Sequence, residues 1–187
     1  MRTGLETAMT CTAGVDVMNA DAADGRQESA TDLEVVAQTL GRYARYWSAL
    51  QMQEVADLWV ATDDPGTAAT YVAEELGDVL LGRPDIEYHL LRTGERLVSA
   101  DVAISEVILR RLGRGWVLAL FLCRWELTGV ETLGGLGGEL VGDHGAGRVS
   151  HSRVSVTLRQ TPAGWRFAHY SEHPYFRPEN TEEDVAQ

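Results

Sequence analysis

Residues 116–128 carry apolar side chains on both sides of a period-two pattern, which is unusual for a surface strand. One side of such a strand would hold Leu118, Leu120 and Leu122, and the other Val117, Ala119, Phe121 and Trp125. A strand that is apolar on both sides is normally covered on both sides. We therefore expect helices of this chain to cover one face, and a second copy, in a homodimer, to cover the outer face.

Three further segments, residues 97–109, 149–160 and 165–173, have the alternation and residue types that are typical of strands. The sequence Thr161-Pro162-Ala163-Gly164 predicts a tight turn, which would join the last two strands into a hairpin. The glycine-dense stretch at residues 129–147 is too long for a simple hairpin loop. It is either a lid over a pocket or a disordered insertion.

The chain before Pro84 has helical periodicity instead. Apolar residues recur at three- and four-residue steps over residues 33–47, just after the capping-box sequence Thr31-Asp32-Leu33-Glu34. A short second helix is expected at residues 55–59, and a third at residues 71–81, where Gly82 would end it. Three N-terminal helices followed by antiparallel strands predict an α+β fold.

The length of 187 residues suits one domain, which we expect at residues 31–176. Residues 1–30 show no hydrophobic period and no signal-peptide pattern, so they are expected to form a disordered tail, and residues 177–187 a frayed end. No apolar run is long enough to span a membrane. A soluble, cytoplasmic protein is the resulting expectation.

Charge and residue types exclude several functions. All 16 basic residues are arginine, against 28 acidic residues, and the net charge of −12 argues against nucleic acid as a partner. Without lysine there is neither a Schiff base nor a phosphate-loop lysine. Two cysteines do not provide a disulfide framework or a cysteine-rich zinc site. No dinucleotide fingerprint is present, so no cofactor is expected.

Three segments together resemble the nuclear transport factor two-like family. They are Gln53-Glu54-Val55-Ala56-Asp57-Leu58-Trp59 after the long first helix, Leu81-Gly82-Arg83-Pro84-Asp85-Ile86, and the closing hairpin at residues 156–167. The resemblance implies a cone in which a curved sheet and the helices enclose a mostly apolar pocket. This superfamily includes SnoaL-like polyketide cyclases, ketosteroid isomerases, scytalone dehydratase, limonene epoxide hydrolase and binding modules, so the fold alone does not give the reaction.

The resemblance also implies site residues. With Trp59 as the anchor, Tyr43 falls on the oxyanion-stabilising tyrosine of ketosteroid isomerases, whereas Val156 stands where their second acid would be. Glu172 falls where SnoaL-like cyclases end the last strand in a proton-transferring aspartate, which is one methylene shorter. A carboxyl group beside an apolar pocket often has a raised pKa, as a general acid or base needs.

His169 competes with Glu172, because strict alternation puts the two on opposite faces of one strand. The apolar partners of His169, which are Trp165 and Phe167, favour an inward imidazole, while the family resemblance favours Glu172. A β-bulge would change this alternation. His169 and His173 would lie ~13 Å apart along a strand, which is too far for one ion, so no metal site is expected.

Four further residues are expected to bind substrate: Arg124, Tyr88, Trp59 and Trp47. The resulting hypothesis is a cofactor-free enzyme that cyclises, isomerises or dehydrates a hydrophobic, oxygenated small molecule such as a polyketide or terpenoid intermediate. Three alternatives remain open. One is a limonene-type epoxide hydrolase that uses Asp101, Arg124, Glu126 and Glu172. The second is a binding or accessory module without turnover. The third, ranked last, is the small subunit of an aromatic-ring dioxygenase, which would require a large partner chain.

Overall fold

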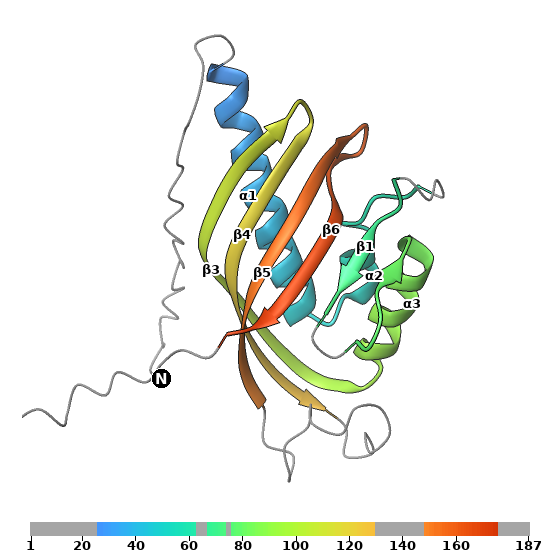
Figure 1. Cartoon of the computed structure of the whole chain (residues 1–187). Helices are drawn as coiled ribbons and strands as arrows, with labels where there is room; N and C mark the ends of the chain where they lie inside the picture. The colour runs from blue at the N-terminus through green and yellow to red at the C-terminus, as the bar shows by residue number, and fades with distance from the viewer. Residues whose placement is uncertain (1–25, 63–66, 74–75, 130–147, 176–187) are drawn as a thin grey trace, which may run out of the picture.

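The computed structural model describes residues 26–62, 67–73, 76–129 and 148–175. In chain order the elements are α1 (Arg26–Ser48), α2 (Met52–Ala56), β1 (Thr70–Val72), β2 (Leu80–Leu81), α3 (Arg83–Gly94), β3 (Leu97–Gly113), β4 (Trp116–Gly129), β5 (Arg148–Thr161) and β6 (Gly164–Pro174). The strands form one curved sheet in the order β2-β1-β6-β5-β4-β3 (Figure 1). The expected α+β class and the four long strands are confirmed.

Two expectations about the sheet and helices were wrong. A helix was expected at residues 71–81, but Tyr71 lies in β1 and pairs with Leu80 of β2. The third helix is α3, which has a proline in its first turn. It begins after Gly82, whose φ of +83° suits glycine. The sheet is mixed, since β1 pairs with β6 in parallel.

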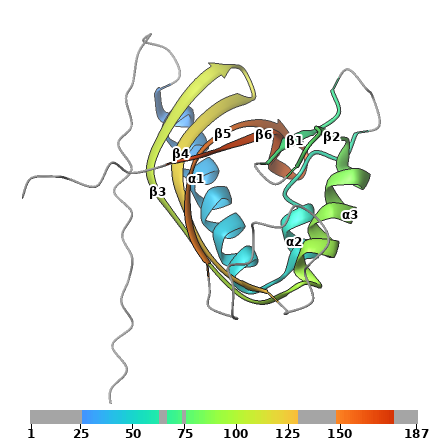
Figure 2. The ribbon, with the colours of Figure 1, turned by 60° about the horizontal axis from the view of Figure 1, so that its bottom comes forward.

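Helix α1 lies against the concave face of the sheet, which curls around it, while α2 and α3 lie together beside the β1 edge (Figure 2). The helix begins at Arg26, ahead of the start expected at Thr31. Its buried stripe consists of Leu33, Val36, Leu40, Tyr43 and Trp47. The Ser48 hydroxyl accepts a hydrogen bond of 2.9 Å from the Val102 amide of β3, which fixes the C-terminal end of α1 to the sheet.

The two faces of β4 are buried unequally. The inner row is buried under α1, and it consists of Val117, Ala119, Phe121, Cys123 and Trp125. On the outer row, Trp116 is 37% exposed and Leu120 is 39% exposed. Among the described residues, the helices therefore cover the concave face and leave this outer row partly exposed, as expected. No helix within the described ranges is long and apolar enough to cross a membrane.

Candidate active site

A β-bulge in β6 decides which side chains of this strand point inward. Thr157 of β5 pairs with His169, but the next residue, Leu158, pairs with Phe167, so Ala168 is an extra residue on β6. The inner row therefore continues after the bulge with Tyr170 and Glu172, which are buried. Strict alternation had placed His169 beside Phe167, and this interpretation was wrong because of the bulge.

Glu172 is held at the end of this inner row by a buried hydrogen bond. The Tyr170 hydroxyl donates to Oε2 of Glu172 over 2.9 Å. Tyr170 is fully buried, and Glu172 is 9% exposed and is the one buried acidic side chain within the described residues. A phenol that donates to a carboxylate fixes its orientation and stabilises its ionised form.

Tyr43 of α1 faces the same group from the opposite side. Its ring lies 5.9 Å from the ring of Tyr170 and 5.3 Å from that of Phe167. Burial raises the pKa of Tyr43 well above its usual range, and the nearby charge of Glu172 raises it further. The same two effects raise the pKa of Cys123. Tyr43 is therefore a neutral phenol at neutral pH, able to donate a hydrogen bond.

Several buried donors around Tyr43 have no hydrogen-bond acceptor within the described part of the chain. They are the Tyr43 hydroxyl and the indole N–H groups of Trp47, Trp59 and Trp125. Tyr170 and Trp47 lie close enough to the Tyr43 hydroxyl to lower its pKa, an effect smaller than the opposing effects of burial and of the Glu172 charge. We call Tyr43, Trp47, Trp125, Tyr170 and Glu172 the interior cluster. Sequence reasoning missed Tyr170 and Trp125, which read as ordinary core residues.

His169 lies outside this cluster. After the bulge its imidazole meets Thr70 of β1, with 2.5 Å between Nδ1 and the threonine hydroxyl. Partial burial lowers the pKa of His169 below its usual value of 6.5, so the ring is neutral at neutral pH. In the described residues no group of three or more His, Cys, Asp or Glu side chains is placed to hold a metal ion.

The lowered pKa of His169 predicts a specific pH dependence of stability. The native state binds fewer protons than the unfolded chain at this site, so the free energy of unfolding falls as the pH drops through about 6.5. Replacing the ring in His169→Gln removes this contribution. We expect chemical denaturation to show a smaller stability loss between pH 7 and pH 5 for this variant than for the wild type.

The exposed His151 supplies the control, His151→Gln, which should lose as much stability between pH 7 and pH 5 as the wild type does. Parallel pH curves for wild type and His169→Gln would contradict the prediction.

Arg124 was expected in the pocket but lies on the outer face of β4. There it forms ion pairs with Asp101 at 3.1 Å and with Glu126 at 2.5 Å. Its sequence neighbours Cys123 and Trp125 occupy the inner face instead. The expected role was wrong because the apolar row that Arg124 continues, Leu118 to Leu122, is the outer one.

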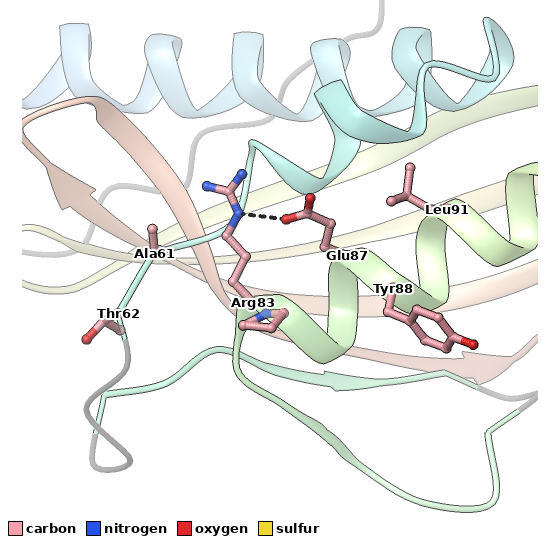
Figure 3. Close-up of a pocket in the computed structure, with 7 residues that line it drawn as sticks. Ala61, Thr62, Arg83, Glu87, Tyr88 and Leu91 are labelled. Atoms are coloured by element: carbon pink, nitrogen blue, oxygen red, sulfur yellow. Dashed lines mark ion pairs between the residues drawn. The ribbon is translucent and has the colours of Figure 1, made fainter.

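Tyr88 lies on the solvent side of α3 and is 69% exposed. Together with Arg83, Glu87 and Leu91 it lines a groove of about 570 Å³ between α3 and Ala61–Thr62 (Figure 3). The charged groups there are paired, since Arg83 contacts both Glu87 and Asp57. The groove holds no buried titratable group, and we place the candidate site at the interior cluster.

No protein-family model matches the sequence, and no curated protein matches it. Solved structures do resemble it. A candidate scytalone dehydratase from Novosphingobium aromaticivorans has a TM-score of 0.65 at 9% identity, over 81% of this chain and 89% of that chain. A candidate dehydratase of the NTF2-like family from Streptomyces avermitilis has a TM-score of 0.64 at 16% identity, over 79% of this chain and 99% of that chain. An NTF2-like superfamily protein from Salmonella enterica has a TM-score of 0.64 at 13% identity, over 82% of this chain and 98% of that chain. The chain has the nuclear transport factor 2-like (NTF2-like) fold.

Proposed function

We propose that this protein is a cofactor-free enzyme that transfers protons on a hydrophobic, oxygenated small molecule, such as a polyketide or terpenoid intermediate. The observation that carries the proposal is the buried pair of Tyr170 and Glu172, with the unpaired hydroxyl of Tyr43 facing it. A buried carboxylate is a suitable base, and a neutral phenol beside it can donate a hydrogen bond to an oxyanion. Cyclisation, isomerisation and dehydration can all begin with the same proton transfer.

The reaction starts at a carbon next to a carbonyl group. The Glu172 carboxylate takes a proton from this carbon, and the electron pair of the broken C–H bond forms the C=C bond of an enolate. The Tyr43 hydroxyl donates a hydrogen bond to the enolate oxygen, while Tyr170 holds the carboxyl group in place. Where the enolate is conjugated with a second C=C bond, return of the proton from Glu172 to the far carbon of that bond completes an isomerisation. Where the carbon beside the enolate carries a hydroxyl group, that group takes the proton from Glu172 and leaves as water, which completes a dehydration.

Two structural neighbours support small-molecule chemistry of this type, because they are named as candidate dehydratases. The limonene-type alternative receives no geometric support. Asp101, Arg124 and Glu126 do form an acid–arginine–acid group, but it lies on the outer face of the sheet, away from Glu172. We further propose that a second copy covers this face in a homodimer, since Ile108 and Leu112 join Trp116 and Leu120 as exposed apolar residues there.

Deuterium exchange on 2-tetralone, an apolar ketone with acidic protons beside its carbonyl, tests the proposed reaction without knowledge of the natural substrate. The enzyme should speed the incorporation of deuterium from D₂O at these carbons, measured by ¹H NMR, well above the rate in buffer. Binding of 2-tetralone without faster exchange would instead identify a binding module.

A further inference from the structure

Three arginine side chains gather where α1, α3 and β6 meet. Arg166 directly precedes Phe167 in β6. Arg42 directly precedes Tyr43 in α1, and the ring of Tyr43 lies 5.3 Å from that of Phe167. Arg83 is the first residue of α3, and its side chain extends from there toward α2 (Figure 3). Three elements that are far apart in the sequence therefore bring guanidinium groups to one region of the molecule.

The positive charges of these arginines act on one another. Partial burial lowers the pKa of Arg166, and the charges of Arg42 and Arg83 lower it further, because a nearby like charge disfavours the protonated form. The charge of Asp57 opposes this shift without cancelling it. Like charges held close together repel, and a bound anion between them would turn this repulsion into attraction.

The carboxylates of this region contact one of the three arginines. Asp57 and Glu87 both form ion pairs with Arg83. The ion pairs of the described residues involve neither Arg42 nor Arg166. Acidic residues are not scarce in this chain, which has 28 of them against 16 arginines. Arg83 thus uses both nearby carboxylates, and within the described ranges Arg42 and Arg166 have no direct counter-ion.

Arg42 and Arg166 also keep hydrogen-bond donors for a ligand. Arg42 donates from Nη2 to Thr39 Oγ1 at 3.0 Å, and its buried Nε–H has no acceptor within the described part of the chain. Arg166 donates from Nη1 to the Trp165 carbonyl at 3.0 Å. A guanidinium group has several further N–H donors in a planar fork. This fork matches the oxygens of a phosphate group, which can accept two parallel hydrogen bonds from one arginine.

We propose that Arg42, Arg83 and Arg166 form a binding site for a phosphate group. A phosphate monoester carries about two negative charges at neutral pH, which would balance the charges of Arg42 and Arg166. Arg83, held by Asp57 and Glu87, borders the site on the side of α3. The ligand is either free phosphate or an organic phosphate whose apolar part lies in the groove beside α3, which Arg83 also lines. The site goes beyond the proposed proton transfer, because none of the three arginines belongs to the interior cluster.

Inorganic phosphate and phenyl phosphate are the probes, with sodium chloride at equal ionic strength as the reference. In protein labelled with ¹³C and ¹⁵N at arginine, ¹³C-detected NMR follows each Nε signal, and Arg→Gln variants assign them. We expect both probes to shift the Nε signals of Arg42 and Arg166. The Nε signal of Arg92, an exposed residue of α3 that pairs with Glu95, should not shift.

Affinities measured by calorimetry give the second readout. Arg42→Gln and Arg166→Gln should each weaken phosphate binding by about 10- to 100-fold, which is the loss expected for one hydrogen bond to a charged group. The matched control is Arg92→Gln, which makes the same change of charge on α3 and should keep the wild-type affinity. Circular dichroism checks that each variant is folded, and the NMR titration of the wild type stands without any variant's affinity.

The two probes distinguish the sources of the phosphate group. Tighter binding of phenyl phosphate would identify an organic phosphate, and equal affinities would identify free phosphate, so both results support the site. No binding of either probe, Nε signals of Arg42 and Arg166 that stay in place, or equal losses of affinity in all three variants would overturn the inference. A loss of affinity in only one of Arg42→Gln and Arg166→Gln would overturn the role of the other arginine.

Discussion

Glu172→Gln is expected to lower the rate of deuterium exchange on 2-tetralone by about 10²- to 10⁴-fold, the usual contribution of a general base. The amide has nearly the same shape as the carboxylate but cannot take a proton. Its oxygen can still accept the hydrogen bond from Tyr170, so the fold should persist. Exchange rates are measured by ¹H NMR, and circular dichroism checks the fold. Glu172→Asp keeps a carboxylate one methylene shorter, and we expect an intermediate rate.

The matched control for this variant is Glu126→Gln. It makes the same chemical change on the outer face of β4, where Glu126 pairs with Arg124 in contact with solvent. Its exchange rate should equal that of the wild type. If the two variants lost activity equally, the loss would reflect charge or stability in general. If Glu172→Gln kept the wild-type rate, Glu172 would not be the base.

The sequence predicted the long strands well and the short ones poorly. Strands β3 to β6 have between 11 and 17 residues each, enough for alternation to be evident. Strands β1 and β2 have three and two residues, too few for any period. Their apolar residues, including Tyr71 and Leu80, fall by chance at spacings that also suit a helix. The pairing partner that makes Tyr71 a strand residue, Tyr170, lies far away in the chain.

The candidate site was only partly predictable for a related reason. Tyr43 was found because a helical stripe identifies its buried face directly. For a strand, the period separates two faces but does not say which is inner, so Arg124 was assigned to the wrong side. The bulge at Ala168 adds one residue to β6, and no residue type in the sequence identifies it. It changes the face of the sheet on which His169 lies and places Tyr170 and Glu172 on the inner face. Only the pairing with β5 reveals it.

Phe167→Ala is expected to lower the free energy of unfolding by about 3–5 kcal/mol, the usual cost of removing a buried phenyl ring. Phe167 is fully buried, and its ring packs edge to face against Trp59 at 5.5 Å and against Tyr43. Its backbone also joins β6 to the segment after α2. The Phe167 amide donates to the Leu58 carbonyl at 2.8 Å, and the Val60 amide donates to the Phe167 carbonyl at 3.0 Å.

Chemical denaturation measures this loss, with Tyr88→Ala as the control. The control removes an aromatic ring of similar size from the exposed side of α3, and we expect it to change stability by no more than about 0.5 kcal/mol. Phe167→Leu fills most of the space and should cost less than about 1.5 kcal/mol. A loss for Phe167→Ala as small as that for Tyr88→Ala would mean that the contact between β6 and α1 does not hold the interior cluster together. Because the Phe167 ring packs against Tyr43, such a result would also mean that the proposed site does not draw the rigidity that proton transfer needs from this ring.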